Sequence, residues 1–241
     1  MRLKQLASFV LLATLPYLNA AMATGQVQPQ ETVWEARPKV VSAIDLLPRT
    51  RLETWIEFQE GLDFSFHRWR TGALISRRMK PILNLRLRDI DEDNDHYLVV
   101  GGGYEYLHTI DQGSLTIDNT IIAFATPHIV FAGLTLADRN RTEFRWLNGV
   151  SNFRYRNRLT VIRQSQIRTF RFAPYGYGEL FYNSTVHSWN QREYAAGVQF
   201  PYKSRLMLDT YWLRESCTSC SHGSVNMIGI TLNLYLRQLQ Q

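Results

Sequence analysis

Arginine recurs at every second residue in two neighbouring segments within residues 136–164, and this alternation limits the fold more than any other feature of the chain. Successive side chains of a β-strand point to opposite faces, so each segment is predicted to be a strand with one charged face. The charged faces carry Arg139, Arg141, Glu143 and Arg145 in the first strand and Arg154, Arg156 and Arg158 in the second. Residues 147–152 contain the turn signal Asn148-Gly149, so the two strands are predicted to form a hairpin.

The other face of the second strand is apolar and carries Phe153, Tyr155, Leu159 and Val161. A soluble β-sandwich turns its apolar face inward and leaves its charges in water. The charged face of this hairpin is too regular and too rich in arginine to be an ordinary solvent-exposed face. The inverse arrangement, with charges inside and apolar groups outside, is typical of a transmembrane barrel. We therefore expect the charged residues to line a lumen.

Residues 1–23 have the pattern of a secretory signal peptide, with a basic start, an apolar run over residues 6–18 and the cleavage motif Ala21-Met22-Ala23. A membrane anchor is the alternative, but the apolar run is too short to span a bilayer. Residues 24–50 contain three prolines and no sustained periodicity. We expect them to form a periplasmic lead-in segment, with a short helix near residues 40–47, ahead of a barrel over residues 51–241.

Alternating runs in the rest of the chain predict eleven strands. They cover residues 52–60, 64–75, 81–88, 96–108, 117–131, 134–146, 154–164, 172–182, 191–200, 205–213 and 225–236. Bacterial single-chain barrels have an even number of strands. Either residues 64–75 form a loop or one strand has been missed. The predicted fold is therefore all-β, an antiparallel up-and-down transmembrane β-barrel of 10–12 strands.

Two short motifs are open to more than one interpretation. Gly101-Gly102-Gly103 lies inside a strand pattern, with no following helix or Lys-Ser/Thr, so it indicates strand curvature or cleared lumen space rather than a phosphate loop. Cys217 and Cys220 have the spacing of a redox motif, but they lack its βαβ context. Zinc would need more ligands than His222 adds. We expect a local disulfide in a loop, on the extracellular side if both chain ends face the periplasm.

The hairpin sequence resembles a known family. Asp138-Arg139-Asn140-Arg141 with Glu143 and Arg145, followed by residues 154–159, is similar to the DUF2490 family of Gram-negative outer-membrane proteins. Trp55 with Glu57, residues 178–182 and His222-Gly223 extend the resemblance over about residues 52–236. The resemblance implies an outer-membrane β-barrel of uncharacterised function and supplies no catalytic residues. Many such barrels end on an aromatic residue that the assembly machinery reads; here Tyr235 is the nearest aromatic residue to the chain end.

The arginine rows allow two interpretations, an anion-conducting lining or a network of paired charges that fills the lumen. Small barrels are largely filled by side chains, and clustered arginines repel one another unless carboxylates face them. The carboxylates available are Glu143, Glu179 and Glu193, with Glu105 and Asp209. We favour the paired network. A symmetric turn over residues 147–152 would place Arg145 opposite Arg154, Glu143 opposite Arg156 and Arg141 opposite Arg158.

Other function classes fit the sequence less well. A lipid- or lipopolysaccharide-modifying enzyme is the main alternative, but adjacent His187 and Ser188 would project to opposite faces of a strand. A soluble periplasmic β-sandwich is the third possibility. We predict no catalytic, metal or cofactor residues. The net charge of +6 could suggest nucleic acid, but exported chains with arginines alternating in strands do not fit that class. The expected partners are outer-membrane lipid, lipopolysaccharide and the barrel-assembly machinery, and the oligomeric state stays open.

Overall fold

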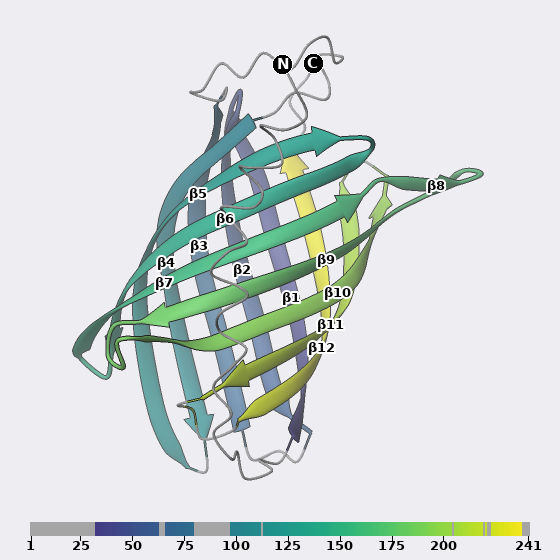
Figure 1. Cartoon of the computed structure of the whole chain (residues 1–241). Coiled ribbons are helices and arrows are strands. Elements are labelled where there is room, and N and C mark those ends of the chain that lie inside the picture. The colour runs from purple at the N-terminus through teal and green to yellow at the C-terminus, as the bar shows by residue number, and fades with distance from the viewer. Residues whose placement is uncertain are drawn as a thin grey trace, which may run out of the picture. The chain divides into compact units, whose positions relative to one another are not determined.

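The computed structural model describes residues 32–62, 66–79, 97–111, 113–203, 205–218, 220 and 223–237. These residues form twelve strands in one sheet (Figure 1). The strands are β1 (Thr32–Leu47), β2 (Thr50–Gly61), β3 (Phe66–Met79), β4 (Tyr97–Asp111), β5 (Ser114–Phe131), β6 (Leu134–Leu147), β7 (Val150–Arg163), β8 (Ser165–Ile167), β9 (Phe170–Asn183), β10 (Ser188–Tyr202), β11 (Leu206–Cys217) and β12 (Ser224–Arg237). In this described part of the chain there is no helix that is long and apolar enough to cross a membrane.

The sheet closes into a barrel of eleven strands, because β8 pairs only with β9 and extends the β7–β9 hairpin beyond the barrel rim (Figure 1). The all-β barrel and its range of 10–12 strands are therefore confirmed. The expectation of an even number is wrong. Each hairpin reverses the chain direction, so an odd number leaves the first and last strands pointing the same way.

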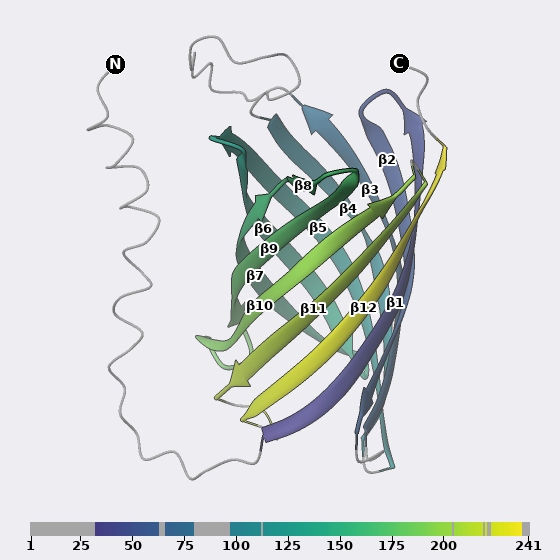
Figure 2. The ribbon, with the colours of Figure 1, turned by 90° about the vertical axis from the view of Figure 1, so that its right-hand side faces the viewer.

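The closing pair β1–β12 is parallel, with Thr32 opposite Ser224 and Ser42 opposite Leu234. The prediction of antiparallel pairing throughout is therefore wrong at this one seam. Figure 2 shows the two strands side by side, running in the same direction. The start of β1 and the β11–β12 connection consequently lie at one end of the barrel, and the end of β12 lies at the other. Chain ends that enter and leave the barrel at the same end, as the even count required, are excluded for the described strands.

Strand β1 is the strand that the sequence patterns missed, and it occupies most of the expected lead-in segment 24–50. The short helix expected near residues 40–47 is therefore wrong, and the barrel begins before residue 51. Pro38 remains compatible with a strand because the pairing of β1 with β2 is interrupted at Arg37 and Pro38. Proline has no N–H to donate to a neighbouring strand. The expected signal peptide and the run at residues 81–88 lie outside the described residues.

Polarity alternates along the strands with the sense expected of an inverted barrel. On β2, Glu57 is 2% exposed and points inward, while its neighbours Ile56 and Phe58 are 50% and 53% exposed and point outward. The buried interior of the described residues is accordingly rich in polar groups. Its hydrophobic part includes a cluster at the inner face of β10–β12, formed by Ala195, Leu213, Val225 and Met227.

The β6–β7 turn fixes the register of the arginine-rich hairpin. Asn148 and Gly149 both have positive φ values, 48° and 84°. Two consecutive residues in the left-handed region make a two-residue hairpin turn of the kind that Asn-Gly favours. Leu147 therefore pairs directly with Val150, which sets every cross-strand pair above it.

Candidate functional site

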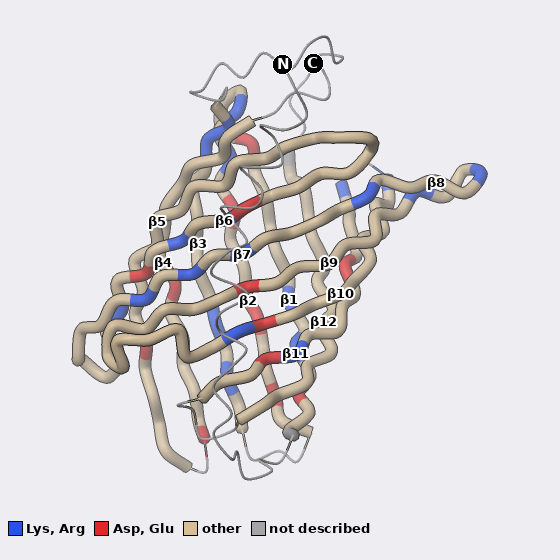
Figure 3. The backbone as a smooth tube through the Cα atoms, viewed as in Figure 1, with Lys and Arg blue, Asp and Glu red and all other residues tan. Residues whose placement is uncertain are grey.

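Charged side chains from eight strands meet on the inner wall of the barrel, and we call this set the lumen charge network. Figure 3 shows acidic and basic positions recurring on neighbouring strands across the middle of the barrel. Ion pairs of 2.5–3.7 Å connect all of its members. They are Arg37, Lys39, Glu57, Arg70, Glu105, Arg139, Arg141, Glu143, Arg154, Arg156, Arg158, Glu179 and Glu193.

The cross-strand pairs in the central hairpin differ from the predicted ones by two residues. The structure places Glu143 opposite Arg154, Arg141 opposite Arg156, Arg139 opposite Arg158 and Arg145 opposite Asn152. The predicted register assumed a symmetric turn over residues 147–152, whereas the turn is only Asn148-Gly149. The shift is an even number of residues, so all seven charged side chains remain on the inner face.

Glu143 is completely buried and is shared by three arginines. Its Oε2 accepts a hydrogen bond from Arg154 Nε at 2.5 Å, and its Oε1 accepts one from Arg156 Nη1 at 3.2 Å. Arg141 Nε lies 2.6 Å from the same Oε1. One carboxylate thus screens three guanidinium groups from one another on β6 and β7.

Glu179 on β9 has the same role one strand further round the barrel. Arg156 donates to it from Nε and from Nη2, both at 2.9 Å, in the two-pronged geometry that suits a guanidinium and a carboxylate. Arg139 Nη2 donates to Glu179 Oε1 at 2.9 Å, and Arg158 Nε donates to Oε2 at 2.8 Å. Glu193 on β10 lies 3.6 Å from Arg158 Nη2. The four sequence-predicted residues Arg156, Arg158, Glu179 and Glu193 are therefore brought together.

Two of these arginines also stack on aromatic side chains of β9. The guanidinium carbon of Arg156 lies 4.4 Å from the ring centroid of Phe181, and that of Arg158 lies 3.8 Å from the ring centroid of Tyr177. Contact with the face of an aromatic ring stabilises a guanidinium where water is excluded. The aromatic rings thus compensate for part of the hydration that these arginines lose.

A second half of the network is built on Glu57, and sequence patterns did not predict it. Arg37 Nε donates to Glu57 Oε1 at 2.8 Å, while Lys39 and Arg70 each lie 3.4 Å from the carboxylate. Glu105 joins the halves, since it lies 3.7 Å from both Arg70 Nε and Arg141 Nη2. The signal that could have found them is the same alternation, in which Arg37 and Lys39 are two residues apart on one face.

Two predicted participants lie outside the network. Arg145 forms a separate ion pair with Asp118, which is buried on β5. Asp209, considered as a counter-charge for the arginines, instead accepts a hydrogen bond of 3.0 Å from the Tyr175 hydroxyl. Asp209 therefore belongs to a polar contact between β9 and β11 and not to the arginine rows.

Burial shows that the network fills the lumen at its level. Glu143 and Glu179 are 0% and 1% exposed, and Glu57, Glu105, Arg141, Arg156 and Glu193 are also buried. An open channel would leave such side chains in contact with water. Within the described residues the network holds eight cationic groups and five carboxylates. Its chemistry is therefore that of a closed, internally paired charge cluster with a surplus of arginine and lysine.

Residues weighed for catalysis or metal binding are not assembled into a site. His187 lies in the β9–β10 turn with φ 50°, and Ser188 begins β10 with an exposed side chain. Among the residues that the structure describes, no three His, Cys, Asp or Glu side chains are grouped to hold a metal ion. Cys217 and Cys220 form a disulfide with 5.5 Å between their Cα atoms, at the β11–β12 connection.

Comparison with known proteins gives one family match. The family described as "Protein of unknown function (DUF2490)" matches residues 94–221, just over half of the 241-residue chain. The match covers the central hairpin, Glu105, Glu179, Glu193 and the first cysteine pair position, but not β1–β3. No curated protein matches the chain.

Proposed function

This chain belongs to the DUF2490 family of proteins of unknown function, and we propose from its geometry that it is an outer-membrane barrel without catalytic activity whose lumen is closed by the lumen charge network. The supporting observation is the inverted distribution of polarity. Charged groups such as Glu143 and Glu179 are buried inside, while large apolar groups such as Ile121 and Phe144 are about half exposed on the outside. Water opposes both arrangements, and a bilayer favours the second.

Barrel closure adds a second argument for a bilayer. Lipid offers no hydrogen-bond partners, so a sheet can cross a membrane only when it has no free edge. Here the β1–β12 and β9–β10 pairs leave the eleven barrel strands without one. The strands have 12–18 residues, which is longer than the 9–11 residues that a tilted strand needs to cross the hydrocarbon.

One polar group on the outer face needs an explanation in this proposal. Asn157 Nδ2 donates to Asp138 Oδ1 at 2.7 Å and to Asn140 Oδ1 at 3.2 Å, and the Tyr155 hydroxyl donates to the same Asn140 oxygen at 2.5 Å. These four side chains satisfy one another by hydrogen bonds. Paired polar groups cost less in an apolar surrounding than isolated ones, so this cluster is compatible with an outward position.

Export is supported by two features of the sequence and structure. Residues 1–23 have the pattern of a signal peptide, and the Cys217–Cys220 disulfide suits an oxidising compartment. A structural role is favoured over an anion channel because the arginines of the central hairpin contact carboxylates instead of facing an open path. The surplus of cations would make any residual conductance prefer anions.

Membrane extraction of two matched variants tests the proposal. Ile56→Arg places a charge in the middle of β2 on the outer face, whereas Val150→Arg places the same charge beside the β6–β7 turn, where Val150 is 69% exposed. In a bilayer, Ile56→Arg should lower the free energy of unfolding by about 2–4 kcal/mol, and Val150→Arg by less than about 1 kcal/mol.

The wild-type chain should stay with outer membranes in high salt and leave them only in detergent. A soluble barrel would be released by salt, and it would tolerate both arginine substitutions equally. Either result would contradict the proposal. Incubation of the purified chain with phospholipid and lipopolysaccharide should release no acyl chains, and their release would overturn the non-catalytic part of it.

A further inference from the structure

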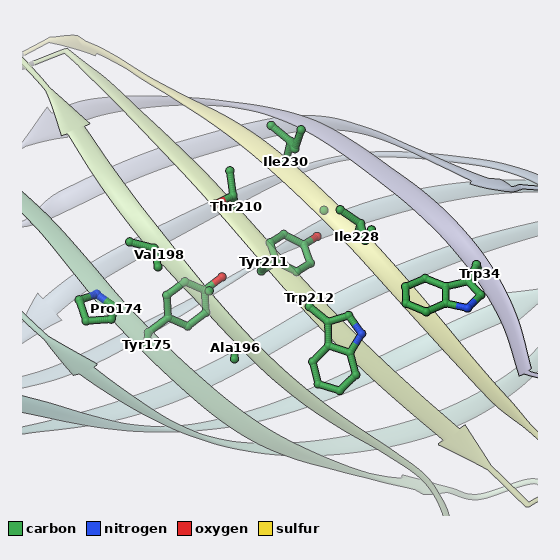
Figure 4. A pocket seen from close by; sticks show the side chains of 12 residues that line it. Trp34, Pro174, Tyr175, Ala196, Val198, Thr210, Tyr211, Trp212, Ile228 and Ile230 are labelled. Carbon is green, nitrogen blue, oxygen red and sulfur yellow. The ribbon is translucent and has the colours of Figure 1, made fainter.

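A shallow apolar groove crosses the outer face of the barrel over β9–β12 and β1 (Figure 4). Its volume is about 730 Å³. The floor is made by small side chains, including Ala196, Val198 and Thr210, and the walls by Trp34, Trp212 and Ile230. Strand alternation and exposure place these walls on the outside, since Trp34, Trp212 and Ile230 are 43%, 42% and 52% exposed.

The groove exists because small and large outward residues are segregated. Ala196 lies opposite Trp212, and Val198 lies opposite Thr210, so the β10 side of each pair is lower than its neighbours. On the inner face Tyr175 covers Gly197 and Tyr211 covers Gly229, where an added Cβ would meet the rings at 2.7 Å and 2.0 Å. These tyrosines close the wall behind the groove, so the hollow opens only outward.

Two arginines lie just beyond one end of the groove on the same outer face. Arg214 follows Trp212 by two residues along β11, and it pairs with Tyr194 on β10. Arg192 lies diagonally next to it, two residues before Tyr194. Same-face neighbours along a strand are about 7 Å apart, and diagonal neighbours across strands are 7–8 Å apart, so both guanidinium groups can reach one ligand. Both arginines are exposed, and among the described residues neither has an ion-pair partner.

A third polar side chain at this end has an unsatisfied acceptor. Asn226 pairs with Arg214 on β11 and with Trp34 on β1. Asn226 is only 7% exposed, yet its Oδ1 is buried without a hydrogen-bond partner. A buried acceptor that stays unpaired costs about 1–3 kcal/mol. A ligand that brings both an anion for the arginines and a hydroxyl donor for Asn226 would satisfy the whole end of the groove.

We propose that this groove binds one diacyl glycerophospholipid. Its phosphate lies between Arg192 and Arg214, a hydroxyl of its headgroup donates to Asn226 Oδ1, and one acyl chain lies along Ala196, Val198 and Thr210 between the tryptophans. The inference rests on the proposed function, because the outer face must lie in a bilayer. Charge complementarity carries the choice of occupant, since guanidinium groups bind phosphate through paired charge-assisted hydrogen bonds.

The test measures retained lipid by native mass spectrometry on the full processed chain, extracted from membranes in mild detergent. The probe is dimyristoylphosphatidylglycerol, and dimyristoylglycerol, which has the same chains without phosphate, is the comparison lipid. The wild-type chain should bind one phosphatidylglycerol, and Arg192→Gln/Arg214→Gln should bind it roughly tenfold more weakly. Ala196→Leu keeps both arginines but fills the groove, and it should weaken binding several-fold. The charge-matched control Arg163→Gln/Arg171→Gln, at exposed positions of β7 and β9, should bind as the wild type does.

Each other outcome counts against the site. Equal binding by all variants, or equal binding of dimyristoylglycerol, would overturn it. Full displacement of the lipid by inorganic phosphate would reduce the site to an anion contact. A wild-type dimer that dissociates only in Ala196→Leu would give the groove to a second copy of the chain. A chain that stays in the membrane without selective lipid loses this inference alone, whereas a chain that is soluble without detergent loses the proposed function as well.

Discussion

Arg156 donates two hydrogen bonds of 2.9 Å to Glu179, from Nε to Oε1 and from Nη2 to Oε2, and its remaining terminal nitrogen donates to Glu143 at 3.2 Å. A single guanidinium on β7 therefore joins carboxylates on β6 and β9. The contact ties three adjacent strands together inside the lumen. Since each carboxylate also has two other arginine partners, the acids and not the arginines are the scarce component of the network.

The scarcity of acids predicts unequal effects of two charge-removing substitutions. Glu143→Gln removes the carboxylate shared by Arg141, Arg154 and Arg156, so it should lower the free energy of unfolding by about 3 kcal/mol. Arg156→Gln leaves Glu143 and Glu179 with two arginines each and relieves repulsion, so it should cost less. Urea unfolding of both variants in liposomes, at low and high salt, measures the difference. Equal, small and salt-independent losses would mean that this row of charges faces water.

Close backbone approach at the glycine run predicts a second pair of unequal effects. A Cβ added at Gly103 would lie 2.0 Å from the Ala73 carbonyl oxygen and 2.8 Å from the Leu74 Cα atom on β3. Backbone atoms in a closed barrel cannot move away cheaply, so Gly103→Ala should destabilise by about 1–3 kcal/mol. Gly176→Ala on β9 is the control, because its Cβ would meet only the Ala195 oxygen, at an ordinary 3.5 Å. Matching unfolding midpoints for the two variants would refute this packing.

The odd strand number predicts which loops share a side of the membrane. The Cys217–Cys220 connection lies at the barrel end where β1 begins, and the β7–β9 hairpin lies at the other end together with the connection over residues 80–96. Outer-membrane barrels carry short turns on the periplasmic side and longer loops outside. We therefore expect the disulfide on the periplasmic side, which reverses the side deduced from an even strand count.

Cysteine labelling in intact cells tests this topology. After mild reduction, an impermeant maleimide should leave Cys217 and Cys220 unlabelled until the outer membrane is permeabilised. In a chain with Cys217→Ser and Cys220→Ser, Arg171→Cys near the β7–β9 extension should label without permeabilisation. The opposite labelling of the two chains would invert the orientation. Labelling of both in intact cells would contradict a membrane-spanning barrel.

Much of the fold could be predicted from the sequence because apolar–polar alternation is a local signal. It placed ten of the eleven barrel strands and the inward face of β6 and β7. It missed β1, whose outward positions include Ala36 and Pro38 and lack the large apolar residues that mark the other strands. The parity of the strand count depends on that one strand, so the parallel closure could not be derived.

The candidate site was predictable only where its partners are close in sequence. Glu143 and Arg154 are neighbours through a tight turn, and the Asn-Gly signal for a two-residue turn already favoured their observed pairing over the symmetric one. Glu57 and Arg37 meet because β1 pairs with β2, and Arg70 reaches Arg141 through Glu105 across β4. Contacts of this second kind follow from barrel closure, which no local pattern encodes.

Single-channel conductance of the refolded wild-type chain in planar bilayers tests the central claim, a barrel that spans the membrane with a closed lumen. Insertion is verified in the same preparation by extraction with detergent but not with high salt. We expect inserted protein that gives no stable conductance steps in concentrated KCl, because Glu143, Glu179 and their arginines fill the lumen. Stable, anion-selective steps from the inserted wild-type chain would contradict the account and make the arginine rows the lining of an open pore.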